Sequence, residues 1–180
     1  NYRLTGYNLN CSISERNNFI LSLHDNYEKI YNAYKPYIKE RLNRLKKFNL
    51  TYIKSDDIEN AIDLYQLTYG NRFNSISAQT FNSFKKICKH YQEKDRTIVR
   101  IVKEASTQEL LAIVLMIKDD NRIYNLASTI TEKGKKLLAN YFLYDRIFIP
   151  FYDSLAFTNW SYLPLPIELR LILLHFTLQD

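Results

Sequence analysis

The sequence contains few of the residues that interrupt or cross-link a chain. Its 180 residues include three glycines, four prolines and two cysteines, while 46% are hydrophobic and 14% are aromatic. Intrinsically disordered chains have the opposite composition, because they lack the apolar surface that a packed core requires. The length suffices for one full core. We therefore expect a folded globular protein with room for at most a small second lobe.

The sparse cysteines and histidines exclude two further classes of protein. Cys11 and Cys88 lie far apart and match neither a C-x-x-C motif nor a zinc-ligand spacing, so a disulfide framework is not indicated. His24, His90 and His175 have no partner at i,i+4, and we expect surface or capping roles for them and no metal site. These features favour a reduced, cytoplasmic compartment.

Long apolar runs are absent as well. No segment approaches the roughly 20 apolar residues of a membrane span, and the N-terminus lacks the layout of a signal peptide. The only methionine is Met116, so the sequence does not begin at a start residue. We expect no membrane span, and we expect that a natural N-terminal part is missing.

Basic side chains outnumber acidic ones by 25 to 19, which gives a net charge of +6. This excess suits a partner that carries phosphates or carboxylates, and it equally suits an ordinary solvated surface. Interleaved tyrosines would let the clusters contact RNA, although a helix stripe also explains the tyrosines. The clusters are Lys35, Lys39, Arg41, Arg44, Lys46 and Lys47, and then Lys85, Lys86, Lys89 and Lys94.

Hydrophobic periodicity and capping residues divide the chain into helices and strands. We expect strands at 16–23, 50–54, 97–103, 110–117 and 122–130, and helices that begin near Asp25, Asp56, Ser77 and Gly134. Pro36 predicts a break in the first helix near Lys35. The run 110–117 is apolar on both faces, so it is predicted to be a central strand paired with 122–130. This order is an α+β arrangement.

A short polar loop lies between the last of these strands and a long helix. A loop with free backbone N–H groups at a helix N-terminus can hold an anion, and Gly134 would allow close approach of a phosphate. Gly134→Asp would then abolish anion binding and leave the melting temperature nearly unchanged. The simpler alternative is a helix-start glycine before exposed lysines. The loop residues in question are Thr131, Lys133, Gly134, Lys135 and Lys136.

Two hydroxyl side chains near this loop are candidates for catalysis. Ser128 ends the strand next to Thr129, where a hydroxyl could meet a reacting group, although a solvent-facing strand end is the plainer interpretation. Tyr144 could act as a general acid if its hydroxyl reaches a cleft. It belongs to an aromatic stripe that also fits a buried core: Tyr141, Phe142, Tyr144 and Phe148.

Three segments of the sequence resemble the FemAB-like acyltransferases of the GNAT superfamily. They read ERNNFILSLHDNYEKIYNAYKPYIKERLNRLKKFNLTYIKSDD, LLAIVLMIKDDNRIYNLAST and EKGKKLLANYFLYDRIF. The similarity runs from about Arg16 to Ser154. It implies that residues 1–154 form the C-terminal lobe of a two-lobed protein whose upstream lobe is missing. The implied fold is a mixed, mostly antiparallel sheet flanked by helices.

The resemblance also implies a function. The family moves an acyl group from a thioester or an aminoacyl-tRNA donor to an acceptor amine on a small molecule or peptide. Such enzymes position two substrates and stabilise the oxyanion with a strand N–H, so they need no catalytic triad. Acyl-coenzyme A is then expected as a donor substrate at the Thr131–Lys136 loop, and no cofactor is bound permanently. Lys136 stands where the family's pyrophosphate loop has its second glycine.

The tail departs from the family. Thr158, Asn159 and Trp160 stand where acidic residues and glycine are expected. We expect residues 155–180 to form a divergent strand and an apolar helix from Pro166 that packs on the sheet or joins a homodimer. This departure supports an alternative function, a non-catalytic GNAT-like lobe for binding or oligomerisation.

Overall fold

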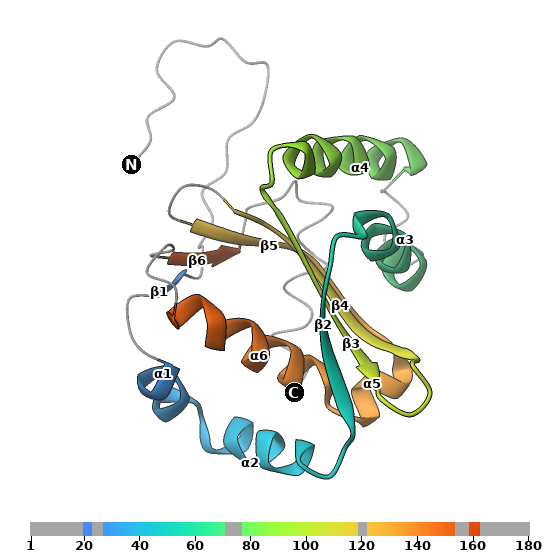
Figure 1. The fold of residues 1–180 in the computed structure, drawn as a ribbon. Coiled ribbons are helices and arrows are strands. Elements are labelled where there is room, and N and C mark those ends of the chain that lie inside the picture. The colour runs from blue at the N-terminus through green and yellow to red at the C-terminus, as the bar shows by residue number, and fades with distance from the viewer. Residues whose placement is uncertain (1–19, 23–26, 71–76, 119–121, 154–158, 163–180) are drawn as a thin grey trace.

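The computed structural model describes residues 20–22, 27–70, 77–118, 122–153 and 159–162, which form a six-stranded sheet between two layers of helices (Figure 1). The strand order is β1-β6-β5-β4-β3-β2. The strands are β1 (Ile20–Ser22), β2 (Leu50–Ser55), β3 (Thr97–Glu104), β4 (Leu110–Lys118), β5 (Arg122–Ile130) and β6 (Asn159–Tyr162). The helices are α1 (Tyr27–Ala33), α2 (Pro36–Leu45), α3 (Ile58–Tyr69), α4 (Ala78–Glu93), α5 (Glu132–Lys136) and α6 (Ala139–Asp153).

Neighbouring strands run antiparallel, except that β5 and β6 are parallel. The α+β fold with a mixed, mostly antiparallel sheet is therefore confirmed. β4 lies between β3 and β5 and is buried along its length except at its two ends. A strand in this position is covered on both faces by other elements, so its residues can be apolar on both faces. The prediction of a central strand at 110–117 is therefore also confirmed.

The sheet separates two hydrophobic cores. On β3, Val99 and Ile101 point to the core under α3 and α4, while Ile98 and Val102 point to the core under α1 and α6. This alternation follows from the period of two along a strand. Residues that pair across neighbouring strands share a face of the sheet. The alternation on β3 therefore also gives the face of each residue that pairs with these four.

The helix boundaries follow local chemistry. Pro36 begins α2 and α1 ends at Ala33, which confirms the predicted break near Lys35. Ser77 caps α4 by accepting a hydrogen bond from the Thr80 N–H, as predicted. The predicted cap at Asp56 is wrong, because β2 continues to Ser55 and the chain needs one more residue to turn. Asp57 caps α3 instead and accepts from the Asn60 N–H.

Several expectations lie outside the described residues. They concern Cys11, His24, Asp25 and His175, as well as the apolar C-terminal helix with its homodimer. Of the strand expected at 16–23, β1 covers Ile20–Ser22. Among the helices of the described part, none is long and apolar enough to cross a membrane.

Candidate functional site

β5 carries an irregularity near its middle. Met116 pairs with Asn125 and Leu115 pairs with Ala127, so Leu126 has no opposite residue on β4. Such a bulge bends the strand and leaves backbone groups unpaired. On its other side, β5 pairs with β6 only as far as Asn125↔Tyr162 among the described residues. Beyond that point the edge of β5 has no strand partner in the described part of the chain.

A buried polar pair lies behind this edge. The Asn125 Nδ2 donates a 2.7 Å hydrogen bond to the Tyr144 hydroxyl on α6. Asn125 is fully buried, and its Oδ1 has no hydrogen-bond partner in the described part of the chain. An unsatisfied buried acceptor costs about 1–3 kcal/mol, and such groups are few in folded proteins. The amide oxygen is therefore an unused acceptor behind the edge of β5.

The two hydroxyl residues at the end of β5 lie on opposite faces of the sheet. Ser128 pairs with Val114, whose side chain lies in the core under α6, so Ser128 shares a face with Asn125. Thr129 pairs with Ile113, which lies in the core under α3 and α4. Thr129 is buried, and its Oγ1 also lacks a partner within the described residues. Ser128 is therefore the hydroxyl on the side of Tyr144.

The residues after β5 form the short helix α5. Thr131 caps it: its Oγ1 accepts from the Gly134 N–H at 3.0 Å, and its carbonyl accepts from the Lys135 N–H at 2.9 Å. Two backbone amides of the predicted anion loop are thus already bonded. Gly134 is buried, and a Cβ built on it would overlap the Leu111 carbonyl oxygen and lie 2.9 Å from the carbonyl carbon. The glycine is required by the packing of α5 on β4.

Carboxylates neutralise two of the three lysines around Gly134. The Lys133 ammonium lies 2.8 Å from Glu104 and 2.7 Å from Glu109, and these hydrogen bonds raise the pKa of Lys133. Lys135 lies 2.6 Å from Glu132. Lys136 is exposed and makes no ion pair with the described residues. Exposed pairs contribute little and can open, so Lys136 and Lys135 are the cations most available to an anion.

Asp145, adjacent to Tyr144 on α6, is a half-buried carboxylate that was not predicted from the sequence. Its Oδ1 accepts a 2.5 Å hydrogen bond from the Tyr27 hydroxyl on α1. Burial raises the pKa of Asp145, while the hydrogen bond from Tyr27 lowers it. Burial also raises the pKa of Tyr34, and the charge of Asp145 adds to this effect. A carboxylate within the aromatic stripe of α6 was the signal for this pair.

The raised pKa of Asp145 predicts a pH-dependent stability. Because the carboxyl binds its proton more tightly in the folded than in the unfolded protein, protonation favours folding. Protonated Asp145 stabilises the fold fully below the pKa that this carboxyl has in the unfolded protein. This stabilisation is lost as the pH rises through its pKa in the folded protein. Asp145→Asn keeps an acceptor for Tyr27 and removes the charge. We expect the variant to melt above the parent at pH 8 and equally near about pH 3.

Circular dichroism melts of Asp145→Asn across this pH range measure the difference. Glu40→Gln on the exposed side of α2 removes a charge without a buried partner and is the control. A lower melting temperature of Asp145→Asn at pH 8 would show that the ionised carboxylate stabilises the fold.

The second basic cluster is partly used within the protein. Lys85 contacts Glu59 at 3.1 Å and also contacts Asp63, while Lys89 lies 2.5 Å from Glu59. These contacts join α4 to α3 along the surface. RNA contact by the basic clusters therefore stays a prediction that rests on their remaining exposed lysines.

The described residues contain no group of three or more His, Cys, Asp or Glu that could hold a metal ion. Cys88 is buried in the core under α3 and α4, and burial raises the pKa of its thiol to about 12. A thiol with so high a pKa is not a nucleophile at neutral pH. The chemistry of the site therefore depends on hydroxyl, amide, carboxyl and ammonium groups.

The sequence matches no family model, and no curated protein matches it. Solved structures with similar folds do exist. FemX superposes with a TM-score of 0.65 at 10% identity, over 81% of this chain and 52% of FemX. A predicted acetyltransferase with acetyl-CoA from Clostridium acetobutylicum gives 0.51 at 10% identity, over 73% of this chain and 90% of that one.

A conserved protein of unknown function from Bacteroides thetaiotaomicron gives a TM-score of 0.51 at 8% identity, over 80% of this chain and 52% of that one. At these identities the likeness concerns the fold. The chain spans about half the length of FemX. It has the FemAB-like GNAT fold.

Proposed function

We propose that the chain is a transferase lobe that moves an acyl or aminoacyl group from a thioester or aminoacyl-tRNA donor to an acceptor amine. The edge of β5 carries this proposal. It combines a bulge at Leu126, a stretch of β5 after Asn125 without a strand partner among the described residues, and a buried polar pair behind the strand. An extended donor can bind such an edge through backbone hydrogen bonds.

The residues around this edge have distinct proposed roles. A backbone N–H released by the bulge would stabilise the negative charge that develops on the donor carbonyl. Tyr144, held in place by Asn125 at 2.7 Å, would donate its proton to the leaving thiolate or alkoxide as the bond from the carrier to the carbonyl breaks. The proton that the acceptor amine loses when the amide bond forms would restore the tyrosine. Ser128 would contact the acyl group from the same face of the sheet.

The lysines after β5 would hold the donor's phosphates. Since the amides of Gly134 and Lys135 already donate to Thr131, side chains have to supply this contact. Lys136 is exposed, and Lys135 can leave its exposed pair with Glu132. The C. acetobutylicum acetyltransferase contains acetyl-CoA, which supports coenzyme A as the carrier for this chain as well. An aminoacyl-tRNA would bring a larger phosphate surface to the exposed lysines.

Calorimetric titration with acetyl-CoA, and filter binding of alanyl-tRNA, test the donor site. We expect Lys136→Glu to weaken binding of the true donor roughly tenfold or more, because it replaces an attraction with a repulsion. Lys54→Glu on β2, an exposed lysine outside both basic clusters, is the matched control and should bind as the parent does.

Catalysis is measured as release of free coenzyme A with a panel of amines. Tyr144→Phe should bind acetyl-CoA normally and lose about 100-fold in kcat, which is typical for a missing general acid. A folded parent protein that binds neither donor would reject the proposal and favour a non-catalytic lobe.

A further inference from the structure

A pocket of about 370 Å³ opens at the end of the sheet opposite Gly134. The pairing of β2 with β3 stops at Ser55↔Val99, so Thr97 and Ile98 extend past the end of β2 and leave a notch. Lys118 pairs with Ile123 near the start of β5, whereas Gly134 follows the end of β5. The notch is therefore at the opposite end of the strands from Gly134. Arg100 and Ser128 both pair with Val114, so the width of β4 separates the notch on β3 from the candidate residues on β5.

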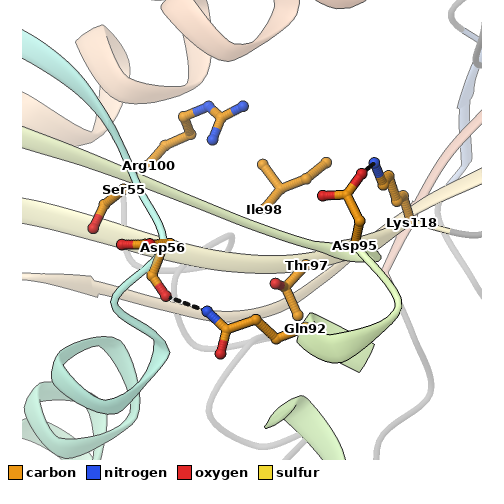
Figure 2. A pocket seen from close by; sticks show the side chains of 8 residues that line it. All are labelled: Ser55, Asp56, Gln92, Asp95, Thr97, Ile98, Arg100 and Lys118. Carbon is orange, nitrogen blue, oxygen red and sulfur yellow. Dashed lines mark hydrogen bonds and ion pairs between the residues drawn. The ribbon is translucent and has the colours of Figure 1, made fainter. Parts of the chain in front are cut away.

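Charged side chains of both signs line the notch (Figure 2). Lys118 is paired with Asp95 at 3.0 Å. Arg100 donates to the Val99 carbonyl at 2.8 Å and makes no ion pair with any described residue. The Asp56 carboxylate also has no partner in the described part of the chain. Figure 2 shows the Arg100 guanidinium pointing away from Asp56, so the two do not neutralise each other.

The remaining lining fixes this arrangement. Gln92 at the end of α4 donates a 2.6 Å hydrogen bond to the Asp56 carbonyl, which ties the end of β2 to α4. Ile98 lies between Arg100 and the Asp95–Lys118 pair and gives the notch an apolar floor (Figure 2). Arg100 is half-buried and stands beside Tyr52, whose pKa is raised by burial and lowered by the guanidinium charge. The guanidinium group of Arg100 is therefore held in place and does not move freely in solvent.

A ligand for this notch has to satisfy an unpaired cation and an unpaired anion together. Arginine binds carboxylates through two parallel hydrogen bonds, and an aspartate accepts from an ammonium group. A phosphate would match Arg100 but would meet the carboxylates of Asp56 and Asp95 in the same pocket. The volume falls at the small end of the range for small-molecule sites.

We propose that this notch binds a small amino acid, with the carboxylate on Arg100 and the ammonium on Asp56. The site is separate from the edge of β5 and does not depend on transferase activity. An amino acid carries one positive and one negative group and therefore has no net charge. The lining carries two cations and two carboxylates, so its charges balance as well.

Chemical-shift titration of the full chain tests this proposal. The probes are glycine, β-alanine, γ-aminobutyrate and 5-aminopentanoate, which place the same two charges at increasing separation. The best-fitting member should bind, and its N-acetyl and amide derivatives, each lacking one charge, should bind at least about tenfold more weakly. Inorganic phosphate should not compete with it.

Two variants locate the site. Arg100→Gln and Asp56→Asn should each weaken binding roughly tenfold or more, since each removes one charge-assisted contact. Arg44→Gln and Glu40→Gln on α2 remove the same charges away from the notch and should leave binding unchanged. Unchanged melting temperatures would show that the variants stay folded.

Three results would overturn the proposal. They are no binding of any amino acid by the folded parent at millimolar concentration, tighter binding of phosphate than of any amino acid, and equal binding by the Arg100 and Arg44 variants. None of these results depends on acetyl-CoA binding, so they are distinct from failure of the proposed transferase function.

Discussion

Gly134→Ala is expected to destabilise the protein by about 2–4 kcal/mol, which corresponds to a fall in melting temperature of roughly 5–15 °C. The added Cβ would overlap the Leu111 carbonyl oxygen on β4 and approach the Ile130 Cγ1 at 3.0 Å. The obstacle is the backbone of the central strand, which cannot move aside as a flexible side chain can. Either α5 must shift away from the sheet or β4 must bend.

Gly70→Ala is the matched control, because a Cβ at that position meets only the Gln66 Cγ, at 3.5 Å. Gly70 has a right-handed helical conformation that alanine adopts easily. Alanine there should leave stability unchanged or raise it by up to about 1 kcal/mol. Thermal melts of both variants measure the difference in stability. Equal melting temperatures would show that α5 accommodates the added Cβ without loss of stability.

The overlap between a Cβ at position 134 and the Leu111 carbonyl changes how the donor site can be tested. The sequence-based expectation was that Gly134→Asp would abolish anion binding and leave the melting temperature nearly unchanged. The contact with Leu111 shows that its second half is wrong, because any Cβ at Gly134 collides with β4. A Gly134 variant without acetyl-CoA binding would therefore not distinguish a lost ligand contact from a displaced helix. Lys136→Glu alters charge without touching the packing.

The features that could be predicted from the sequence are those set by local chemistry. The apolar run of β4, the proline at the start of α2 and the serine cap of α4 each depend on a few neighbouring residues. The order of strands along the chain also gave the antiparallel meander, since short turns join them. The resemblance in three segments anticipated the GNAT fold that the superposition with FemX supports.

The features that could not be predicted depend on contacts between distant segments. Gly134 suggested phosphate approach, but the group that approaches it is the Leu111 carbonyl, 23 positions earlier. Asn125 was not singled out, because its partner Tyr144 lies on a helix that only the fold brings to β5. Asp145 and Tyr27 likewise meet through the packing of separate elements, which also bring Asp56 and Arg100 to one pocket.

The contact between Asn125 and Tyr144 also shows what the aromatic stripe of α6 could indicate. An aromatic stripe with helical spacing predicts a buried face, and the hydroxyl of a buried tyrosine needs a partner. The stripe therefore implied a polar group on the opposing strand, although not which one. Asn125 is that group.

Asn125→Asp is expected to make the stability of the fold strongly dependent on pH. The replacement has the same shape, and a protonated carboxyl can still donate to the Tyr144 hydroxyl as the amide does. At a fully buried position the ionised form is strongly disfavoured, so the folded pKa rises above the unfolded value of about 3.9. Stability is then near the parent level below that value and is lost as the pH rises through the folded pKa.

A shift of about three units for a buried carboxyl corresponds to a loss on the order of 4 kcal/mol at pH 8, or roughly 10 °C in melting temperature. Denaturant unfolding of Asn125→Asp at pH 4 and pH 8 measures this difference. Asn82→Asp on the exposed face of α4 is the control, and its stability should follow the parent within about 0.5 kcal/mol at both pH values. If Asn125→Asp also showed no pH dependence beyond the parent's, water would have to reach position 125. The edge of β5 would then border a solvated cleft, and the residues behind the donor site would not be shielded from water.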